Sequence, residues 1–167
     1  MSMELILVRH AIAFERNRQR WPDDGERPLT PLGKQKFRRA AAGLAKWLPK
    51  VERVLTSPLV RARQTAAILS ETARWPKATD APELAPKSSP AAVLAMLRKQ
   101  KARRIALVGH EPDLSELLAA CITTSGTHLS VTLKKGGVVC VHFARDGRPG
   151  AGTLVAFIPP RALRRMR

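Results

Sequence analysis

Two histidines and two arginines lie just after apolar runs that are typical of buried strands. Arg9 and His10 directly follow one run, His110 lies two residues after another, and Arg61 lies in the helix expected after a third. In open α/β sheets, ligands bind beyond the carboxyl ends of the parallel strands, so we expect these side chains to meet at one edge. One histidine at a strand end is most often structural, but three coincident polar strand ends indicate a site.

Such a set of side chains suits phosphoryl transfer. The guanidinium groups of Arg9 and Arg61 can hold phosphoryl oxygens through forked hydrogen bonds, and the helix N-termini expected near residues 57 and 112 add N–H donors. Neighbouring cations lower the pKa of a histidine from its ordinary value of about 6.5, and a neutral imidazole is a good nucleophile toward phosphorus. The set therefore predicts a phosphohistidine intermediate. Paired carboxylates are missing from these strand ends, so we expect no metal ion and no cofactor.

Short apolar runs alternate along the chain with stretches of helical periodicity. A polar loop covers residues 14–29, and Thr30-Pro31, Ser57-Pro58 and Ser89-Pro90 each look like a helix start. We expect strands at residues 5–8, 51–56, 105–108, 130–133, 138–143 and 153–158, and helices from 31, from 57, over 90–101 and over 114–122. This order predicts an α/β fold of three layers, αβα, with a mainly parallel sheet and a C-terminal antiparallel hairpin.

The length and composition fit one domain with a real hydrophobic core. The chain has 167 residues, of which 44% are hydrophobic and 26% charged. We place a single domain at residues 1–160 and a basic tail at 161–167, which we expect to be solvated.

Sequence features favour a cytoplasmic protein. Arg9 and His10 break the apolar run near the N-terminus too early for a signal peptide, and no stretch approaches the roughly 18 apolar residues that span a bilayer. Cys121 and Cys140, the two cysteines, fall in apolar patterns and cannot form a multi-bridge framework, so we expect buried thiols. Cys140 and His142 alternate on one strand, but two ligands without partners are more often core residues than a metal site.

The net charge of +17 attracts anions of several kinds. With three Trp, four Phe and no Tyr, the chain offers little aromatic surface for stacking bases, which argues against nucleic acid as the partner. A basic run at residues 98–104 is interpreted as a solvated helix end. A non-catalytic basic binding module nevertheless stays open as an alternative function.

Three segments resemble the motifs of the histidine phosphatase superfamily, whose fold is that of phosphoglycerate mutase. Residues 7–11 resemble its Arg-His motif, with Ala11 where most members carry Gly, and residues 57–66 and 108–112 resemble its second and third motifs. Within the superfamily, the chain is most similar to the SixA-type phosphohistidine phosphatases. Shared features are the small size and the segments at residues 27–30, 82–84 and 133–136.

The resemblance implies a role for each of the four site residues. His10 would be the nucleophile, Arg9 and Arg61 would hold the phosphoryl oxygens, and His110 would donate to an oxygen, most usefully as an imidazolium. The implied substrate is a phosphorylated protein histidine, carried by a phosphocarrier or phosphorelay domain, and the implied process is signal transduction. Neither the resemblance nor the residues fix an oligomeric state.

One departure from the superfamily pattern bears on the substrate. Members that act on phosphomonoesters usually carry a carboxylic acid two residues past a Leu, and here Pro86 follows Leu84 at that spacing. An alkoxide needs a proton in order to leave, whereas the conjugate acid of an imidazole has a pKa of only about 6.5. The pattern therefore favours P–N over P–O substrates. Glu83 lies close enough to keep a phosphomonoesterase of small metabolites or polyphosphate as an alternative.

Overall fold

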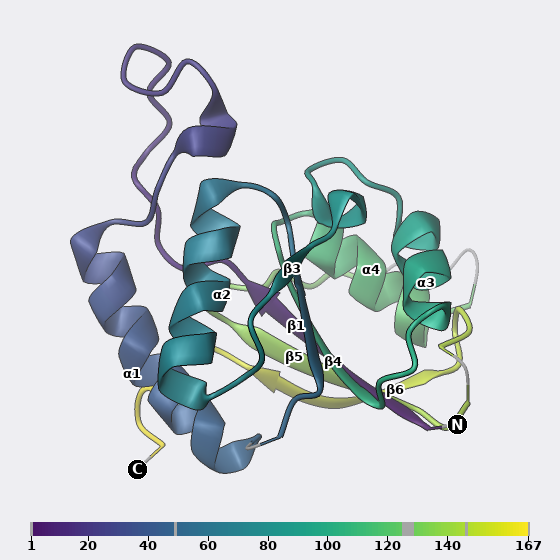
Figure 1. Cartoon of the computed structure of the whole chain (residues 1–167). Coiled ribbons are helices and arrows are strands. Elements are labelled where there is room, and N and C mark those ends of the chain that lie inside the picture. Colours follow the sequence, from purple (N-terminus) through teal and green to yellow (C-terminus); the bar gives the residue numbers. More distant parts are fainter. Residues whose placement is uncertain (1, 49, 125–128, 146, 167) are drawn as a thin grey trace.

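A six-stranded mixed sheet forms the centre of the computed structural model, which describes residues 2–48, 50–124, 129–145 and 147–166 (Figure 1). The strands are β1 (Met3–Arg9), β2 (Arg53–Thr56), β3 (Thr79–Asp80), β4 (Arg104–Gly109), β5 (Val138–Phe143) and β6 (Gly152–Ile158). The helices are α1 (Pro31–Trp47), α2 (Val60–Ala73), α3 (Pro90–Arg98), α4 (Asp113–Ile122) and α5 (Pro160–Leu163), with short 3₁₀ turns η1 (Asp24–Glu26) and η2 (Pro82–Leu84).

The strands lie in the order β3-β2-β4-β1-β5-β6. Strands β3, β2, β4 and β1 run parallel to one another, whereas β5 is antiparallel to both β1 and β6. The predicted parallel sheet with a C-terminal antiparallel hairpin is therefore confirmed. In this order β4 lies between β1 and β2, so the carboxyl ends of three parallel strands lie next to one another.

Helices cover both faces of the sheet and make the predicted three layers. Helices α1, α2 and α5 pack on one face, where Ile6 and Val8 of β1 point into the core. Helices α3 and α4 pack on the other face, where the alternate residues Leu5 and Leu7 point. Because β1 is buried on both faces, its sequence is a continuous apolar run and does not alternate with polar residues.

Two of the three predicted helix starts follow the expected capping pattern. The side chains of Thr30 and Ser89 accept hydrogen bonds from the backbone N–H three residues on, at 2.9 and 3.2 Å, and a proline occupies the first position of each helix. Helix α2 begins at Val60, later than expected, because the Ser57 side chain binds a histidine rather than capping the helix. Helix α3 ends at Arg98 instead of near residue 101.

The strand predicted at residues 130–133 is wrong, because this segment is a loop. Leu133 is buried, and its backbone groups bind two side chains, those of Arg9 and Glu111. Backbone groups occupied by side chains are not available to a strand ladder.

The solvated tail expected from residue 161 is also wrong for its first residues. Arg161 to Leu163 belong to α5, and the Leu163 side chain is fully buried against α1. The contact requires Gly43, because a Cβ there would lie 2.0 Å from the Leu163 carbonyl oxygen. Arg167 lies outside the described residues, and the domain boundary at residue 160 stays a prediction.

The two cysteines are free and buried, as expected, and they lie on opposite faces of the sheet. Among the described residues, no three His, Cys, Asp or Glu side chains are grouped closely enough to hold a metal ion. Within the same residues, none of the helices has the length and apolar character that crossing a membrane requires.

Candidate active site

The two site histidines lie side by side because β1 and β4 are neighbouring parallel strands. Arg9, the last residue of β1, pairs in register with Gly109 at the end of β4, and the backbone N–H of His10 donates to the Gly109 carbonyl at 3.0 Å. The rings of His10 and His110 lie 5.1 Å apart between centroids, with an angle of 54° between their planes. Both side chains are buried.

Arg61 joins the histidines from the first turn of α2. The backbone N–H of Ser57 donates to the Val108 carbonyl at 2.9 Å, which holds the end of β2 against β4. A cavity of about 380 Å³ is lined by all four predicted residues, Arg9, His10, Arg61 and His110. Its other lining residues are Phe14, Glu15, Arg16, Arg27, Pro86, Glu111 and Lys135. The structure thus brings together the four side chains that the sequence predicted as the site.

The hydrogen bonding of His10 leaves one ring nitrogen free for chemistry. Its Nδ1 lies 2.7 Å from the Ala11 carbonyl oxygen, which can only accept, so Nδ1 carries the proton and Nε2 keeps its lone pair. Burial, followed by the charges of His110, Arg61 and Arg9, lowers the pKa of His10 to about 3, against the opposing effect of the Ala11 bond. The ring is therefore neutral near pH 7.

Ala11 fits where most superfamily members carry Gly. Its side chain is buried, and its N–H donates to the Thr65 hydroxyl at 3.0 Å. The same hydroxyl donates to the Arg61 carbonyl at 2.7 Å. Thr65 thereby joins the loop after His10 to the helix turn that carries Arg61.

The ring of His110 is held at Nε2, whereas that of His10 is held at Nδ1. Its Nε2 lies 2.7 Å from the hydroxyl of Ser57, and this hydroxyl also accepts from the Leu59 N–H at 3.4 Å. A serine hydroxyl can donate to Nε2 or accept from it, and when it donates, the proton of His110 lies on Nδ1. Burial first, and then Arg61 and Arg9, lower the pKa of His110 to about 3. Near pH 7 the ring of His110 is thus neutral and not the expected imidazolium.

Arg9 is held through the loop that the sequence had suggested as a strand. Its Nη1 donates to the Leu133 carbonyl at 2.6 Å, and the Leu133 N–H donates to the Glu111 carboxylate at 2.5 Å. Glu111 also accepts from the hydroxyl of Ser115 at 2.7 Å. Burial lowers the pKa of Arg9, and Glu111 partly opposes this shift. Glu111 therefore fixes the loop that fixes Arg9.

Arg61 is held directly by an acidic residue of the loop between β1 and α1. Its Nη1 donates to the Asp24 carbonyl at 2.7 Å, and its Nη2 lies 3.2 Å from the Asp24 carboxylate. The same carboxylate accepts from Arg27 at 2.8 Å. The hydrogen bond from Arg27 is the main reason that the pKa of Asp24 is lowered, and the charge of Arg61 adds to it. Asp24 thus stays ionised between two arginines.

Three buried nitrogen atoms of the site have no hydrogen-bond partner within the described part of the chain. They are Nε of Arg9, Nε of Arg61 and Nδ1 of His110, and all three residues line the cavity around His10. Buried polar atoms are nearly always paired, so unpaired ones need an explanation. Donors gathered around a neutral imidazole suit an anion with several oxygens, such as a phosphoryl group.

Pro86 and Glu83, the two residues that bear on the choice of substrate, differ in whether they line the cavity. Pro86 lines the cavity, whereas Glu83, in η2, is not among the described residues that line it. The carboxylates that do line it are those of Glu15 and Glu111, and Glu111 is occupied by Leu133 and Ser115.

Sequence reasoning missed the residues that hold the site together. It gave no role to Asp24, Ser57, Thr65 or Glu111, although Ser57, Thr65 and Glu111 lie inside the segments that resemble superfamily motifs. Asp24 carried no such signal, because an Asp before Gly in a polar loop is typical of a turn.

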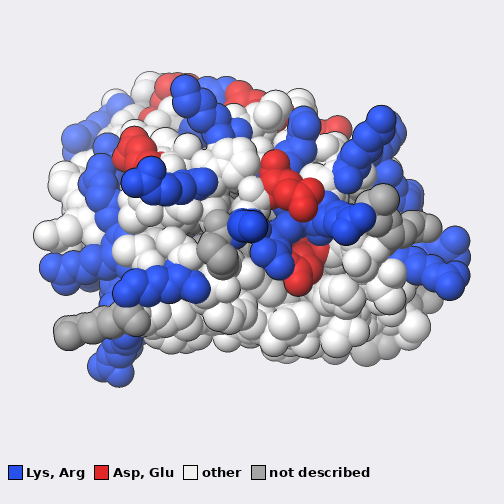
Figure 2. Space-filling view, turned by 60° about the horizontal axis from the view of Figure 1, so that its bottom comes forward, with Lys and Arg blue, Asp and Glu red and all other residues white. Residues whose placement is uncertain are grey.

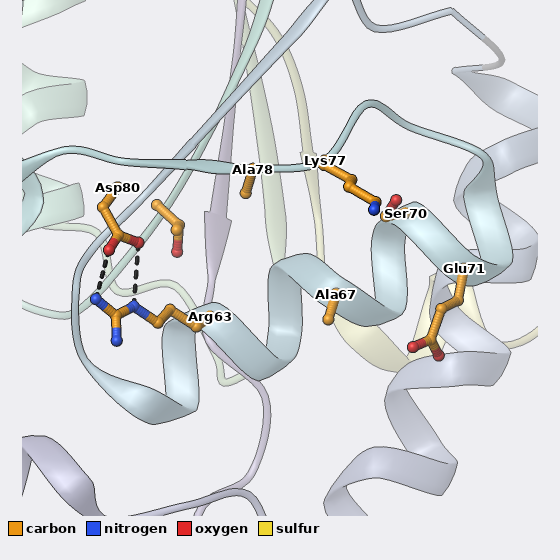
Figure 3. Close-up of a pocket in the computed structure, with 8 residues that line it drawn as sticks. Arg63, Ala67, Ser70, Glu71, Lys77, Ala78 and Asp80 are labelled. Atoms are coloured by element: carbon orange, nitrogen blue, oxygen red, sulfur yellow. Dashed lines mark hydrogen bonds and ion pairs between the residues drawn. The ribbon is translucent and has the colours of Figure 1, made fainter.

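A second hollow, also about 380 Å³, lies between α2 and the chain that leads to β3 (Figure 3). Arg63 and Asp80 pair across one end of it, and the Arg63 Nε lies 3.1 Å from the Asp80 carboxylate. Its described lining residues include neither His nor Cys, so nucleophilic groups converge at the strand ends and not here.

Comparison with known proteins gives both a family match and uncharacterized relatives. The model of the histidine phosphatase superfamily (branch 1) matches residues 5–85. An uncharacterized protein of Picosynechococcus sp. is 40% identical over 141 residues, which cover 82% of this chain and 83% of the relative. An uncharacterized protein of Mycobacterium tuberculosis is 31% identical over 157 residues, which cover 84% of this chain and 96% of that protein.

Solved structures of phosphatases share the fold. The protein histidine phosphatase SixA complexed with tungstate has a TM-score of 0.83 and 26% identity, with 96% of this chain and 99% of that chain covered. The putative phosphohistidine phosphatase SixA from Agrobacterium tumefaciens has a TM-score of 0.78 and 21% identity, over 95% and 98%. A mycobacterial glucosyl-3-phosphoglycerate phosphatase has a TM-score of 0.69 and 16% identity, over 95% and 100%.

Proposed function

Because the chain belongs to the histidine phosphatase superfamily, we propose that it is a phosphohistidine phosphatase with His10 as its nucleophile. The proposed substrate is a protein histidine, on a phosphocarrier or phosphorelay domain, and the proposed reaction uses neither a metal ion nor a cofactor. The observation that carries this proposal is the set of three unpaired buried nitrogen atoms, from Arg9, Arg61 and His110, around the neutral ring of His10. The two cysteines, Cys121 and Cys140, are buried free thiols. Free thiols fit a reducing compartment, and we propose the cytoplasm.

The first step would transfer the phosphoryl group to the enzyme. The lone pair on Nε2 of His10 attacks phosphorus and an N–P bond forms, while the P–N bond to the substrate breaks and its electron pair goes to the substrate nitrogen. The substrate imidazole, protonated on its other nitrogen, leaves as a neutral ring. Arg9, Arg61 and His110 would donate to the phosphoryl oxygens, which share the charge of a loose transition state. The negative charge of the bound group also favours the protonated form of His110.

The second step would return the enzyme to its starting state. Water attacks phosphorus and the bond to Nε2 of His10 breaks. The electron pair of that bond returns to Nε2, so His10 is again a neutral ring with its proton on Nδ1. The water oxygen and both of its protons leave as dihydrogen phosphate, which exchanges protons with the solvent. Because Nδ1 stays bonded to the Ala11 carbonyl throughout, the ring keeps one orientation in both steps.

The lining of the cavity supports a P–N substrate. Pro86 stands where superfamily phosphomonoesterases usually carry an acid, and an imidazole leaves without one. The similarity to the SixA structure supports the same reading, because that protein is described as a protein histidine phosphatase. Its bound tungstate is a tetrahedral oxyanion.

A phosphomonoesterase is the second candidate, and Glu15 favours it. This carboxylate lines the cavity and is exposed, so it could supply a proton to an alkoxide. The two candidates are separated by comparing kcat/KM on a histidine-phosphorylated carrier domain with that on p-nitrophenyl phosphate. The proposal requires faster turnover of the phosphoprotein, and much faster turnover of the ester would reverse the order.

The nucleophile is tested by trapping the intermediate. After brief mixing with substrate, wild-type protein should carry phosphate that is labile in acid and stable in base, and His10→Ala should carry none. Turnover retained in His10→Ala would remove the mechanism. Absence of hydrolysis on every phosphorylated substrate, with steeply salt-dependent binding of a polyanion, would instead support the basic binding module.

A further inference from the structure

The segment from Phe14 to Arg27, called the arm below, projects from the body of the molecule beside the proposed active site (Figure 1). The described arm residues that line the cavity are Phe14, Glu15, Arg16 and Arg27, which lie near its two ends. Its middle therefore stands beyond the cavity. Loops of this length in compact domains are usually functional when they are ordered.

The tip of the arm is ordered by its own contacts. The Asn17 side chain accepts from the N–H groups of Gln19 and Arg20, both at 2.9 Å, and the Trp21 N–H donates to the Asn17 carbonyl at 2.8 Å. The Arg20 guanidinium lies 4.8 Å from the centre of the Phe14 ring and 4.5 Å from that of Trp21. A surface arranged in advance loses less entropy when a partner binds.

The arm is also fixed relative to the phosphoryl-binding groups. Arg27 is buried, and it donates to the Phe14 carbonyl at 2.5 Å and to Asp24 at 2.8 Å. Asp24 in turn binds Arg61. A protein that contacts the arm is therefore placed at a set position with respect to His10.

The tip combines positive charge with aromatic side chains. Residues 16–20 include three arginines and no acidic residue, and all five are exposed. The acidic residues of the arm lie outside this stretch. Two of them already have partners within the chain, since Asp23 accepts from the Gly25 N–H and Asp24 binds Arg61. Arginine and tryptophan are the residues that most often dominate the energy of protein interfaces.

Charge over the whole molecule does not by itself locate a docking surface. Figure 2 brings forward the lower side of Figure 1, away from the arm, and Lys and Arg are spread over that side as well. What distinguishes the arm is its rigid projection and its connection to Arg61.

We infer that the arm is the docking surface for the phosphorylated protein, and that it binds an acidic patch beside the phosphohistidine. The inference rests on the proposed function and names the partner surface that this function requires. A small phosphorylated metabolite that fills the cavity does not extend to Arg18 or Arg20, which are not among the described lining residues. A folded domain that inserts its phosphohistidine covers the rim and meets the tip.

The test is a charge reversal on the tip with two substrates of different size. For Arg18→Glu/Arg20→Glu, kcat/KM on an acidic histidine-phosphorylated carrier domain should fall at least about tenfold at low salt, mostly through KM. Hydrolysis of free phosphohistidine should stay within about twofold of wild type, because neither Arg18 nor Arg20 lines the cavity. Raising the salt concentration should shrink the difference on the protein substrate.

Two further variants make the test specific. Lys99→Glu/Lys101→Glu changes the net charge by the same amount on exposed residues that lie before β4, at the opposite end of the strand from His110. This variant should lose less than about threefold on the protein substrate, since long-range attraction is shared over the whole surface. Arg18→Glu alone keeps the Arg20 stack, so it should show a smaller loss of the same kind even if the double variant disturbs the arm.

The outcomes separate the inference from the proposed function. Equal losses for the arm and control pairs, or unchanged activity of the arm pair on the phosphoprotein, would overturn the docking surface. Equal losses of the arm variant on both substrates would do the same, because the arm would then act on the cavity. Wild-type protein that hydrolyses neither phosphohistidine substrate faster than an ester would instead overturn the proposed function.

Discussion

The two arginines of the site are held by different parts of the molecule. Arg9 is fixed through the Leu133 loop by Glu111, which lies two residues after β4 and also binds the first turn of α4. Arg61 is fixed by Asp24, which belongs to the projecting arm. Similar guanidinium groups are therefore supported on one side by the core and on the other by a surface loop.

This difference separates stability from function in a way that can be measured. Removing the support of Arg9 leaves buried backbone groups unpaired, so it should cost stability as well as activity. The Asp24 carboxylate that supports Arg61 is 39% exposed, so water can take its place, and ion pairs that water reaches contribute little to stability. The residues that support Arg9 should therefore contribute to both stability and activity, whereas the residue that supports Arg61 should contribute mainly to activity.

The largest expected effect is loss of either guanidinium itself. Arg61→Ala should lower kcat/KM by about 10²–10³, as is typical when one donor to a developing charge is removed. Arg9→Ala should lower it similarly, because both Nε atoms are unpaired donors. The measurement is steady-state turnover of a histidine-phosphorylated domain.

A matched control for Arg61 lies two residues along the same helix. Arg63 pairs with Asp80 across the second hollow and does not line the proposed active site (Figure 3). Arg63→Ala should leave kcat/KM within about threefold of wild type, since exposed ion pairs contribute little. Equal losses for Arg61→Ala and Arg63→Ala would show that neither arginine grips the phosphoryl group.

Glu111→Gln should lose both activity and stability. The amide can still accept one bond but cannot match the charge-assisted bonds to the Leu133 N–H and to Ser115, so we expect about 1–3 kcal/mol lower free energy of unfolding. With the Leu133 loop loosened, kcat/KM should fall about tenfold. Urea unfolding and steady-state kinetics measure the two losses. Glu116→Gln, an exposed change on α4, should alter neither, and equal behaviour of the two variants would contradict the support assigned to Glu111.

Asp24→Asn should lose activity without losing stability. Arg61 would keep its bond to the Asp24 carbonyl but lose the carboxylate, so we expect KM to rise about tenfold and kcat to fall less. The free energy of unfolding should change by less than about 1 kcal/mol, because the pair is partly exposed. Asp23→Asn, a neighbouring change on the same arm, serves as the control. A loss of stability as large as that of Glu111→Gln would show that the supports of Arg9 and Arg61 do not differ in their contribution to stability.

The strand-end residues were predictable from sequence because their signal is local. An apolar run that ends in Arg9-His10 or in Gly109-His110 indicates both a strand and a polar group at its end. Neighbouring parallel strands then bring such ends together without further information. The three-layer fold was predictable for the same reason, since each helix repeats its apolar pattern within a short stretch.

The supports were not predictable because they join distant segments through loops. Arg9 reaches Leu133 across 124 residues, and Arg61 reaches Asp24 across 37. Ser57 looked like a helix cap and Leu133 looked like part of a strand, since each has the local pattern of that element. In both cases the group that would complete the element binds a site residue instead.

The burial of His10 and His110 should make the stability of the protein sensitive to acid. The pKa of His10 and that of His110 are both about 3, against an ordinary value of about 6.5, so the unfolded chain binds more protons than the folded one between these values. Stability should therefore fall as the pH drops from about 6.5 toward 3, and these two groups should not affect it above that range.

This pH dependence can be assigned by substitution. Urea unfolding at a series of pH values should give a shallower slope below about pH 6.5 for His10→Gln/His110→Gln than for wild type, because glutamine does not titrate. Equal slopes for the two proteins would show that the site histidines are not the groups that remain neutral.

The smallest expected effect concerns the hydrogen bond that orients His110. Ser57→Ala removes the hydroxyl 2.7 Å from Nε2, so the ring of His110 loses the hydrogen bond that orients it toward the phosphoryl group. The loss of one such bond amounts to about 0.5–1.5 kcal/mol, which corresponds to a decrease in kcat of about two- to tenfold. Ser70→Ala, on α2 at the second hollow, should leave kcat unchanged. Because Ser57 acts through His110, adding Ser57→Ala to His110→Ala should cost little more than His110→Ala alone, and independent losses would show that Ser57 has a different role.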